Sequence, residues 1–298
     1  MRSPRGSMVT TTTRSDATAA YLRRLGVDGD LTPSFDTLVR LHRAHLDAVP
    51  YENLGIMLGR PPSVDPAASL ARIGEVGRAG YCFHQNGALG GALSELGFEV
   101  GRRHGHVYTS EDDREVAELN HLVLVVDGLP TEDNPEGRWW VDAGLGDGFR
   151  DPVPVMVGRH DQSGFRYEIT EVRADGWSFR HDRAGAFTGI EISSRSVDQS
   201  AVDEAHARLS EPAQGRFAKV LVVQRRDDTG VDTVRGCLHL RVTPEDSTET
   251  ELATYDVWRA ALVDGARLLL EGVDHDELRA LYGAQWAKHL AWTAAGRP

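Results

Sequence analysis

The spacing of apolar residues changes close to Gly97, and this change most constrains the fold. Before Gly97, apolar residues recur every three or four positions, as they do on one face of a helix. Leu89 and Leu93 belong to such a stripe. From Phe98 to about Val197, short apolar runs are separated by Gly, Asp and Pro, which is typical of β-strands. The sequence therefore predicts an α+β protein whose helical part precedes its strands.

The expected elements divide the chain into three parts. Helices are expected at residues 17–25, 35–49, 66–76, 255–270 and 276–292, and strands at 122–126, 138–141 and 165–169. The segments 217–224 and 233–242 flank an Asp-Asp-Thr-Gly turn, so we expect them to form a hairpin. We predict a helical part at residues 8–97, an antiparallel barrel or sandwich at 98–200, and an α+β part at 201–298.

Composition narrows the class of protein. With 298 residues, 40% of them hydrophobic, the chain can bury a substantial core. A net charge of -12 disfavours nucleic acid as a partner, and no apolar run reaches the roughly 20 residues that span a membrane. The two cysteines form no paired framework, which favours a reducing cytoplasm. Residues 1–7 lack the apolar core of a signal peptide and are interpreted as a leader ahead of Met8.

Cys82 is a candidate nucleophile because it directly precedes a helix-like run. A thiol reacts at neutral pH only where its thiolate is stabilised, and a helix N-terminus with a nearby imidazolium does this. The Asn86-Gly87 step predicts that the helix begins slightly after Phe83. The other cysteine, Cys237, falls within an expected strand and is interpreted as a small buried hydrophobe. The same plain interpretation stays open for Cys82.

His121 and Asp142 supply the other members of a possible catalytic triad. If residues 121–126 and 137–142 form the arms of one hairpin, His121 lies directly opposite Asp142. The carboxylate would then orient the imidazole, which in turn would activate Cys82. A surface histidine beside a turn aspartate is the alternative. Papain-like proteases place their histidine much further beyond the cysteine, so that class is disfavoured.

Four short segments between residues 50 and 146 carry the resemblance to a known family. They are Pro50-Tyr51-Glu52-Asn53-Leu54, Arg78-Ala79-Gly80-Tyr81-Cys82-Phe83-His84-Gln85-Asn86, Asn120-His121-Leu122-Val123 and Val141-Asp142-Ala143-Gly144-Leu145-Gly146. In this order they resemble the motifs of the arylamine N-acetyltransferase family. Its corresponding segments include Pro-Phe-Glu-Asn, Arg-Gly-Gly-aromatic-Cys-aromatic-Glu-x-Asn and Val-Asp-x-Gly-x-Gly.

The resemblance implies both an architecture and an activity. The architecture is an N-terminal helical bundle, a central antiparallel β-barrel and a C-terminal α/β lid, with the triad arranged as in cysteine proteases and transglutaminases. The activity is transfer of an acetyl group from acetyl-CoA to an aromatic amine, hydrazine or hydroxylamine through an acetyl-cysteine at Cys82. The resemblance also implies a Glu52–Arg78 charge pair behind the nucleophile, no metal, and a cytoplasmic role in xenobiotic metabolism. It does not identify the residues that bind CoA.

Two positions depart from the family pattern. Ala79 replaces the first glycine of the nucleophile segment, which matters only where the backbone needs a positive φ. His84 replaces the usual glutamate, and an imidazole supplies only part of a carboxylate's hydrogen bonding. We expect these changes to affect the rate or the choice of acceptor, and to leave the triad in place.

Other functions stay open at the level of the sequence. Relatives within the same family close polyketide macrolactam antibiotics as amide synthases, and a hydrolase or transglutaminase-like enzyme shares the triad. A metal-binding module would use Cys82, His84, His104 and His106 as ligands. A dinucleotide site at 144–148 lacks the strand–helix context that it needs. A homo-oligomer also remains open.

Overall fold

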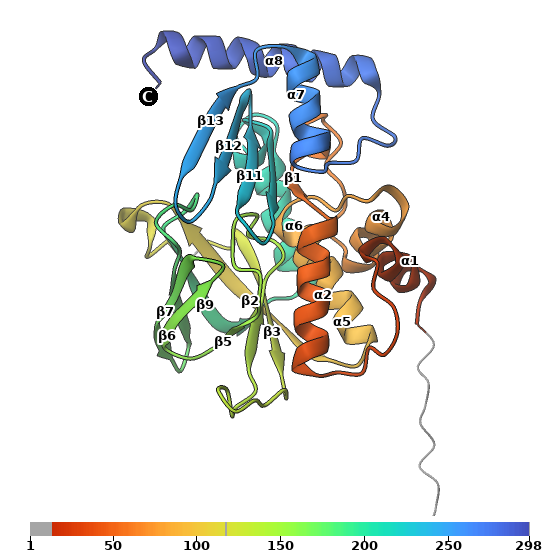
Figure 1. The fold of residues 1–298 in the computed structure, drawn as a ribbon, viewed down its shortest axis with the longest axis vertical. Helices are drawn as coiled ribbons and strands as arrows, with labels where there is room; N and C mark the ends of the chain where they lie inside the picture. The colour runs from red at the N-terminus through yellow and green to blue at the C-terminus, as the bar shows by residue number, and fades with distance from the viewer. Residues whose placement is uncertain (1–13, 117, 298) are drawn as a thin grey trace, which may run out of the picture.

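The computed structural model describes residues 14–116 and 118–297, so the leader expected at residues 1–7 lies outside the described residues. In Figure 1 the N-terminal helices lie on the right, the larger sheet at the lower left, and the C-terminal strands and helices at the top. The predicted α+β class is confirmed. The part boundaries at residues 97 and 200 stay a prediction.

The N-terminal part is built from helices, close to the ranges predicted. They are α1 (Asp16–Leu25), α2 (Phe35–Ala48), α3 (Leu54–Met57), α4 (Pro66–Val76) and α5 (Cys82–Glu95). Ser15, Ser34 and Asp65 cap α1, α2 and α4, each accepting a hydrogen bond from a backbone N–H of the first turn. These caps satisfy donors that a helix start leaves unpaired, which explains why the starts were readable from the sequence.

Helix α5 is the most buried of these helices and carries Cys82 as its first residue. The prediction that it begins after Phe83 is therefore wrong. The Asn86-Gly87 step favours a later start, since an asparagine side chain competes for nearby backbone groups when it lacks other partners. Here that side chain instead donates to the carbonyl of Leu122 on a neighbouring strand, so the helix continues undisturbed.

The middle of the chain forms an eight-stranded antiparallel sheet that curves into a nearly closed barrel. Its strands are β2 (Glu99–Tyr108), β3 (His121–Asp127), β4 (Trp139–Val141), β5 (Val153–Pro154), β6 (Gly158–Gln162), β7 (Phe165–Arg173), β8 (Gly176–Arg180) and β9 (Gly189–Ser196). They follow the order β5-β4-β3-β2-β9-β8-β7-β6. On β3, Leu124 packs into the helical core and Val125 into the barrel core. Strand β3 therefore separates the two cores.

Strands β3 and β4 form the predicted hairpin with a different register. Leu124 pairs with Val141 and Val126 with Trp139, so the predicted direct pairing of His121 with Asp142 is wrong by two positions. The connection between the strands is long, and only short turns set a register by themselves. Because side chains alternate with a period of two, this shift leaves every side chain on its predicted face.

A second, five-stranded antiparallel sheet combines the C-terminal part with a strand from the helical part. It contains β1 (Tyr51–Glu52), β10 (Val222–Arg226), β11 (Val231–Arg235), β12 (Leu238–Val242) and β13 (Ser247–Glu251), in that order. The expected strand at 233–242 is two strands, because Gly236 takes a φ of 57° and reverses the chain. Cys237 therefore lies in a turn and not, as predicted, within a strand.

The remaining helices cover the C-terminal sheet and the nucleophile. They are α6 (Gln199–Ser210), α7 (Tyr255–Ala260) and α8 (His275–Ala294). Helix α7 is shorter than the expected 255–270, because a π-helical turn at Ala261–Gly265 follows it. Helix α8 runs across one end of the molecule (Figure 1). Within residues 14–116 and 118–297, no helix combines the length and apolar character needed to cross a membrane.

Candidate active site

Cys82, His121 and Asp142 come from three elements and meet beside one cavity. Cys82 begins α5, His121 begins β3, and Asp142 directly follows β4. Cys82 and His121 line a cavity of about 450 Å³. The structure thus brings together the three residues that the sequence analysis singled out, and their catalytic roles stay a prediction.

Asp142 is held by four hydrogen-bond donors. Its Oδ2 accepts from His121 Nε2 at 2.7 Å and from Trp140 Nε1 at 3.0 Å. Its Oδ1 accepts from Asn86 Nδ2 at 2.7 Å and from the backbone N–H of Gly144 at 3.0 Å. Donors on both oxygens give this buried carboxylate a single orientation toward the imidazole.

Opposing effects act on the pKa of His121. Burial lowers this pKa, but the Asp142 carboxylate and Cys82 raise it by more, so it lies above its usual value. The imidazole therefore carries a proton at neutral pH. Because Nε2 is bonded to Asp142, Nδ1 is the ring nitrogen left for the Cys82 thiol. An imidazolium in this place stabilises a thiolate.

Asn86 joins the nucleophile helix to the other two elements. It lies four residues after Cys82, on the same face of α5. Besides its bond to Asp142, it donates to the carbonyl of Leu122 at 2.6 Å and accepts from the N–H of Ala143 at 2.9 Å. The sequence alone assigns no role to Asn86, although its spacing of four residues from Cys82 is a usable signal.

Gly144 lets the chain pass close over the nucleophile. A Cβ at this position would lie 2.6 Å from the Cα of Cys82 and 3.0 Å from Nδ2 of Asn86. Any larger residue would therefore push the loop away from the thiol. This close approach gives the family's Val-Asp-x-Gly pattern a physical reason in this chain.

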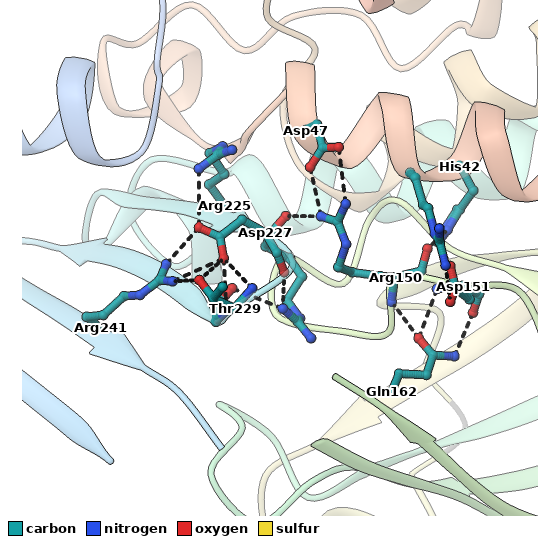
Figure 2. Close-up of polar contacts among 12 residues, drawn as sticks. His42, Asp47, Arg150, Asp151, Gln162, Arg225, Asp227, Thr229 and Arg241 are labelled. Carbon is teal, nitrogen blue, oxygen red and sulfur yellow. Dashed lines mark hydrogen bonds and ion pairs between the residues drawn. The ribbon is translucent and has the colours of Figure 1, made fainter. Parts of the chain in front are cut away.

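The loop after Asp142 is also held from its far side, by His42 of α2 (Figure 2). His42 Nε2 accepts from the backbone N–H of Asp142 at 3.1 Å, and Nδ1 lies 2.7 Å from the carbonyl oxygen of Arg150. Since Nε2 accepts, Nδ1 carries the proton and donates. Burial lowers the pKa of His42 and keeps the ring neutral, as this arrangement requires.

The segment at Arg150 attaches the same loop again to α2 and also to β10 and β6 (Figure 2). Its guanidinium donates to the Asp47 carboxylate of α2 at 2.8 and 3.1 Å and to the backbone oxygen of Arg226 on β10 at 3.1 Å. On β6, Gln162 Oε1 accepts from the N–H groups of Arg150 and Asp151, both at 2.9 Å. The loop that carries Asp142 is therefore fixed at both ends.

Glu52 and Arg78 do not pair directly in the part of the chain that the structure describes. Glu52 accepts a hydrogen bond from the N–H of Leu54, and Arg78 donates to the carbonyls of Leu269 and Glu271. Burial raises the pKa of Glu52, while Arg78 is one of the cations that lower it. In place of the expected charge pair, each of the two buried side chains forms hydrogen bonds with the backbone.

The four residues of the metal-binding alternative do not gather around one point. No group of three or more His, Cys, Asp or Glu side chains suited to a metal ion occurs among residues 14–116 and 118–297. His84 is buried behind the nucleophile and faces the carbonyl of Pro62 at 3.1 Å. Cys82 faces His121 instead.

Comparisons with known proteins agree with this geometry. A family model described as N-acetyltransferase matches residues 34–271. The chain belongs to the arylamine N-acetyltransferase family. It is 38% identical to an arylamine N-acetyltransferase of Mycolicibacterium smegmatis over 149 residues, and 32% identical to one of Escherichia coli over 126 residues. These matches cover 47% and 42% of this chain, and 53% and 42% of the two relatives.

Solved arylamine N-acetyltransferase structures share the fold over most of the chain. One from M. smegmatis superposes with a TM-score of 0.78 at 26% identity, covering 88% of this chain and 96% of that one. One from Salmonella typhimurium has a TM-score of 0.79 at 23% identity and covers 91% of this chain and all of its own. The predicted resemblance and architecture are therefore confirmed.

The two departures from the arylamine N-acetyltransferase pattern have simple structural outcomes. Ala79 is buried and is not one of the described non-glycine residues with positive φ, so its Cβ fits this backbone. Burial lowers the pKa of His84 to about 3, so the ring is neutral. It donates one hydrogen bond, to Pro62, and its Nδ1 has no partner among the described residues.

Proposed function

We propose that this protein is an acetyl-CoA-dependent arylamine N-acetyltransferase that works by double displacement through an acetyl group on Cys82. The observation that carries the proposal is the His121 imidazole, which Asp142 holds at 2.7 Å and which lines one cavity together with Cys82. Family membership supports the reaction type. A thiolate–imidazolium pair is suited to acyl transfer because it provides both the nucleophile and the proton for the leaving group.

In the first half-reaction the Cys82 thiolate attacks the thioester carbonyl. The C–S bond to CoA breaks, and the departing thiolate takes the proton of His121. The N–H groups of His84 and Gln85 donate to the carbonyl of Tyr81, whereas those of Cys82 and Phe83, at the start of α5, are suited to stabilise the oxyanion. The products are acetyl-Cys82 and free CoA.

In the second half-reaction an amine enters the emptied cavity and attacks acetyl-Cys82. Its proton passes to His121, which is now neutral, and the amide leaves. Aromatic amines, hydrazines and hydroxylamines suit this step because they are largely unprotonated at neutral pH. This chemistry fits a role in xenobiotic metabolism. Both cysteines are free thiols, which agrees with the proposed cytoplasmic location.

CoA as the carrier is supported by one related structure and by local charge. A solved structure with a TM-score of 0.79 and 24% identity is an M. marinum arylamine N-acetyltransferase in complex with CoA. In the present chain Arg216, Lys219 and Arg235 line the cavity. Their positive charges are suited to the phosphate groups of CoA in a protein that is acidic as a whole.

Intact-mass spectrometry after mixing with acetyl-CoA tests the proposal. We expect the gain of one acetyl group, lost in Cys82→Ala and kept in Cys237→Ala. Burial raises the pKa of Cys237 to about 11, so that thiol stays protonated and unreactive. Folded protein that gains no acetyl group would contradict the proposal. An amide synthase of macrolactam biosynthesis would instead require a tethered polyketide acyl chain as donor.

A further inference from the structure

A second histidine–aspartate pair, Asp147 and His181, lines the same cavity as Cys82 and His121. Asp147 lies in the loop after Asp142, and His181 directly follows β8. The two side chains are 6% and 1% exposed, so both are almost fully buried. The acetyl-transfer steps described above use neither of them.

Three polar atoms of this pair have no hydrogen-bond partner among the described residues. They are Oδ1 of Asp147 and both ring nitrogens of His181. Oδ1 of Asp147 and Nε2 of His181 lie 3.4 Å apart, close enough for an electrostatic contact but without the geometry of a hydrogen bond. Buried polar atoms in proteins almost always have partners, because burial removes their water without replacement. At a cavity wall, such atoms indicate a place for a polar ligand group.

The pair is held in position by the loop between β8 and β9. The other carboxylate oxygen of Asp147 accepts from the backbone N–H of Ala186 at 2.6 Å. The ring of His181 packs edge-on against Phe187, with 4.1 Å between ring centres, and against Gly185, where a Cβ would lie 2.5 Å from the ring. These contacts fix both side chains and leave the three atoms without a hydrogen bond.

The charges of the pair define what it can bind. Burial raises the pKa of Asp147, but the adjacent His181 and backbone N–H groups lower it by more, so the pKa lies below its usual value. Oδ1 of Asp147 is therefore a pure hydrogen-bond acceptor, whereas the imidazole of His181 always provides at least one N–H donor. A matching ligand group must donate to one residue and accept from the other.

We propose that Asp147 and His181 bind a hydroxyl or amide group of a substrate and thereby determine substrate preference. The inference rests on the proposed acetyltransferase function. Such a group has two possible sources: a substituent on the acceptor amine, or an amide of the pantetheine arm of CoA. Both sources offer the same donor–acceptor chemistry to the pair, and the two half-reactions separate them.

Two variants remove the proposed contacts and keep the packing. Asp147→Asn keeps an oxygen for the N–H of Ala186, and His181→Phe keeps an aromatic ring against Phe187. Asp232→Asn is the matched control. Asp232 forms a similar pair with His239 at 2.9 Å, on the face of β11 that points away from the cavity-lining residues of that strand.

Steady-state kinetics with two pairs of substrates gives the readout. In a double displacement, kcat/KM for the donor reports only acylation and kcat/KM for the acceptor only the second half-reaction. Para-aminophenol and para-toluidine differ at the hydroxyl group, and acetyl-CoA and para-nitrophenyl acetate differ by the pantetheine arm. In both variants we expect one preference, for para-aminophenol or for acetyl-CoA, to fall by about 10- to 100-fold.

The outcome also tells which substrate carries the group. A lower preference for para-aminophenol assigns it to the acceptor, and a lower preference for acetyl-CoA assigns it to the donor. Preferences in both variants that match those of Asp232→Asn overturn the inference. Wild-type protein that still forms acetyl-Cys82 in that case leaves the proposed function intact, whereas failure of acetylation itself would remove the proposed function.

Discussion

In the proposed mechanism, each ring nitrogen of His121 has a separate task. Nε2 is bonded to Asp142, and Nδ1 is left for the Cys82 thiol and later for the leaving group. Because the pKa of His121 is raised, the proton that CoA needs is already on the ring before the donor arrives. The carboxylate thus contributes both an orientation and a charge, and these two contributions are separable by mutation.

Replacing Asp142 by asparagine removes the charge and keeps the size. We expect acylation of Cys82 to slow by roughly 10³- to 10⁴-fold, as in other triads that lose their carboxylate. Without Asp142 the pKa of His121 falls, so the imidazolium is lost at lower pH and the alkaline limb of the acylation profile moves to lower pH. Stopped-flow release of CoA between about pH 5 and 10 measures both effects.

Trp140→Phe is the control for this experiment. It removes one donor to Asp142 and keeps the carboxylate and an aromatic ring in the barrel core. We expect its alkaline limb to stay close to that of the wild type. An Asp142→Asn variant whose alkaline limb does not move would show that another group sets the protonation of His121.

At the scale of elements, hydrogen bonds connect the loop after β4 to α2, β6 and β10 (Figure 2). His42 is its central contact, since it binds the loop at Asp142 and again at Arg150. The position of the Asp142 carboxylate therefore depends on a helix residue one hundred positions earlier in the chain.

His42→Phe tests how much the contacts of His42 contribute to the position of this loop. It fills the space but leaves the N–H of Asp142 and the carbonyl of Arg150 unpaired, so we expect a loss of ~2–4 kcal/mol in the free energy of unfolding. Acylation should slow as the carboxylate loses its fixed position. His42→Gln carries both a donor and an acceptor and should recover part of both losses. Denaturant titration and the acylation rate check this, and equal effects of Phe and Gln would contradict it.

The limits of the sequence prediction follow from this arrangement. Cys82, His121 and Asp142 were readable because each stands at the end of an expected element and within a short motif. His42 and His181 were missed because their contacts join residues far apart in the chain, and no local spacing records them. The β3–β4 register was wrong for a similar reason, since the packing of a long loop sets it.

At the scale of the whole molecule, buried neutral histidines make stability depend on pH. Burial lowers the pKa of His45 to about 4 and that of His84 to about 3, from an ordinary value of 6.5. Below pH 6.5 these two histidines therefore bind protons in the unfolded chain but stay neutral in the folded chain. The contribution of these neutral histidines to the free energy of unfolding is fully present above the ordinary pKa of 6.5, and it is lost as the pH falls toward the lowered values.

Between pH 6.5 and about 5.5 we expect the two histidines to reduce the free energy of unfolding by roughly 2 kcal/mol. His84→Gln keeps a donor for Pro62 and removes one titrating group, so its stability should fall less steeply with acid. His275→Gln, at an exposed site, serves as control and should keep the wild-type slope. Urea titrations over this pH range measure the free energy of unfolding of all three proteins. An equal dependence on pH in all three would contradict the assignment of this effect to His84.

Strand β1 joins regions that are made at very different times. The ribosome adds Gln224, the partner of Tyr51, about 10–35 seconds after Tyr51 itself, at ~5–20 residues per second. Before Gln224 and the residues after it are made, the cavity lacks the wall that β10 to β12 contribute. By that time Cys82 has already left the exit tunnel of the ribosome. The newly made thiol therefore passes through a period of open exposure to cellular oxidants, and completion of the second sheet ends that period.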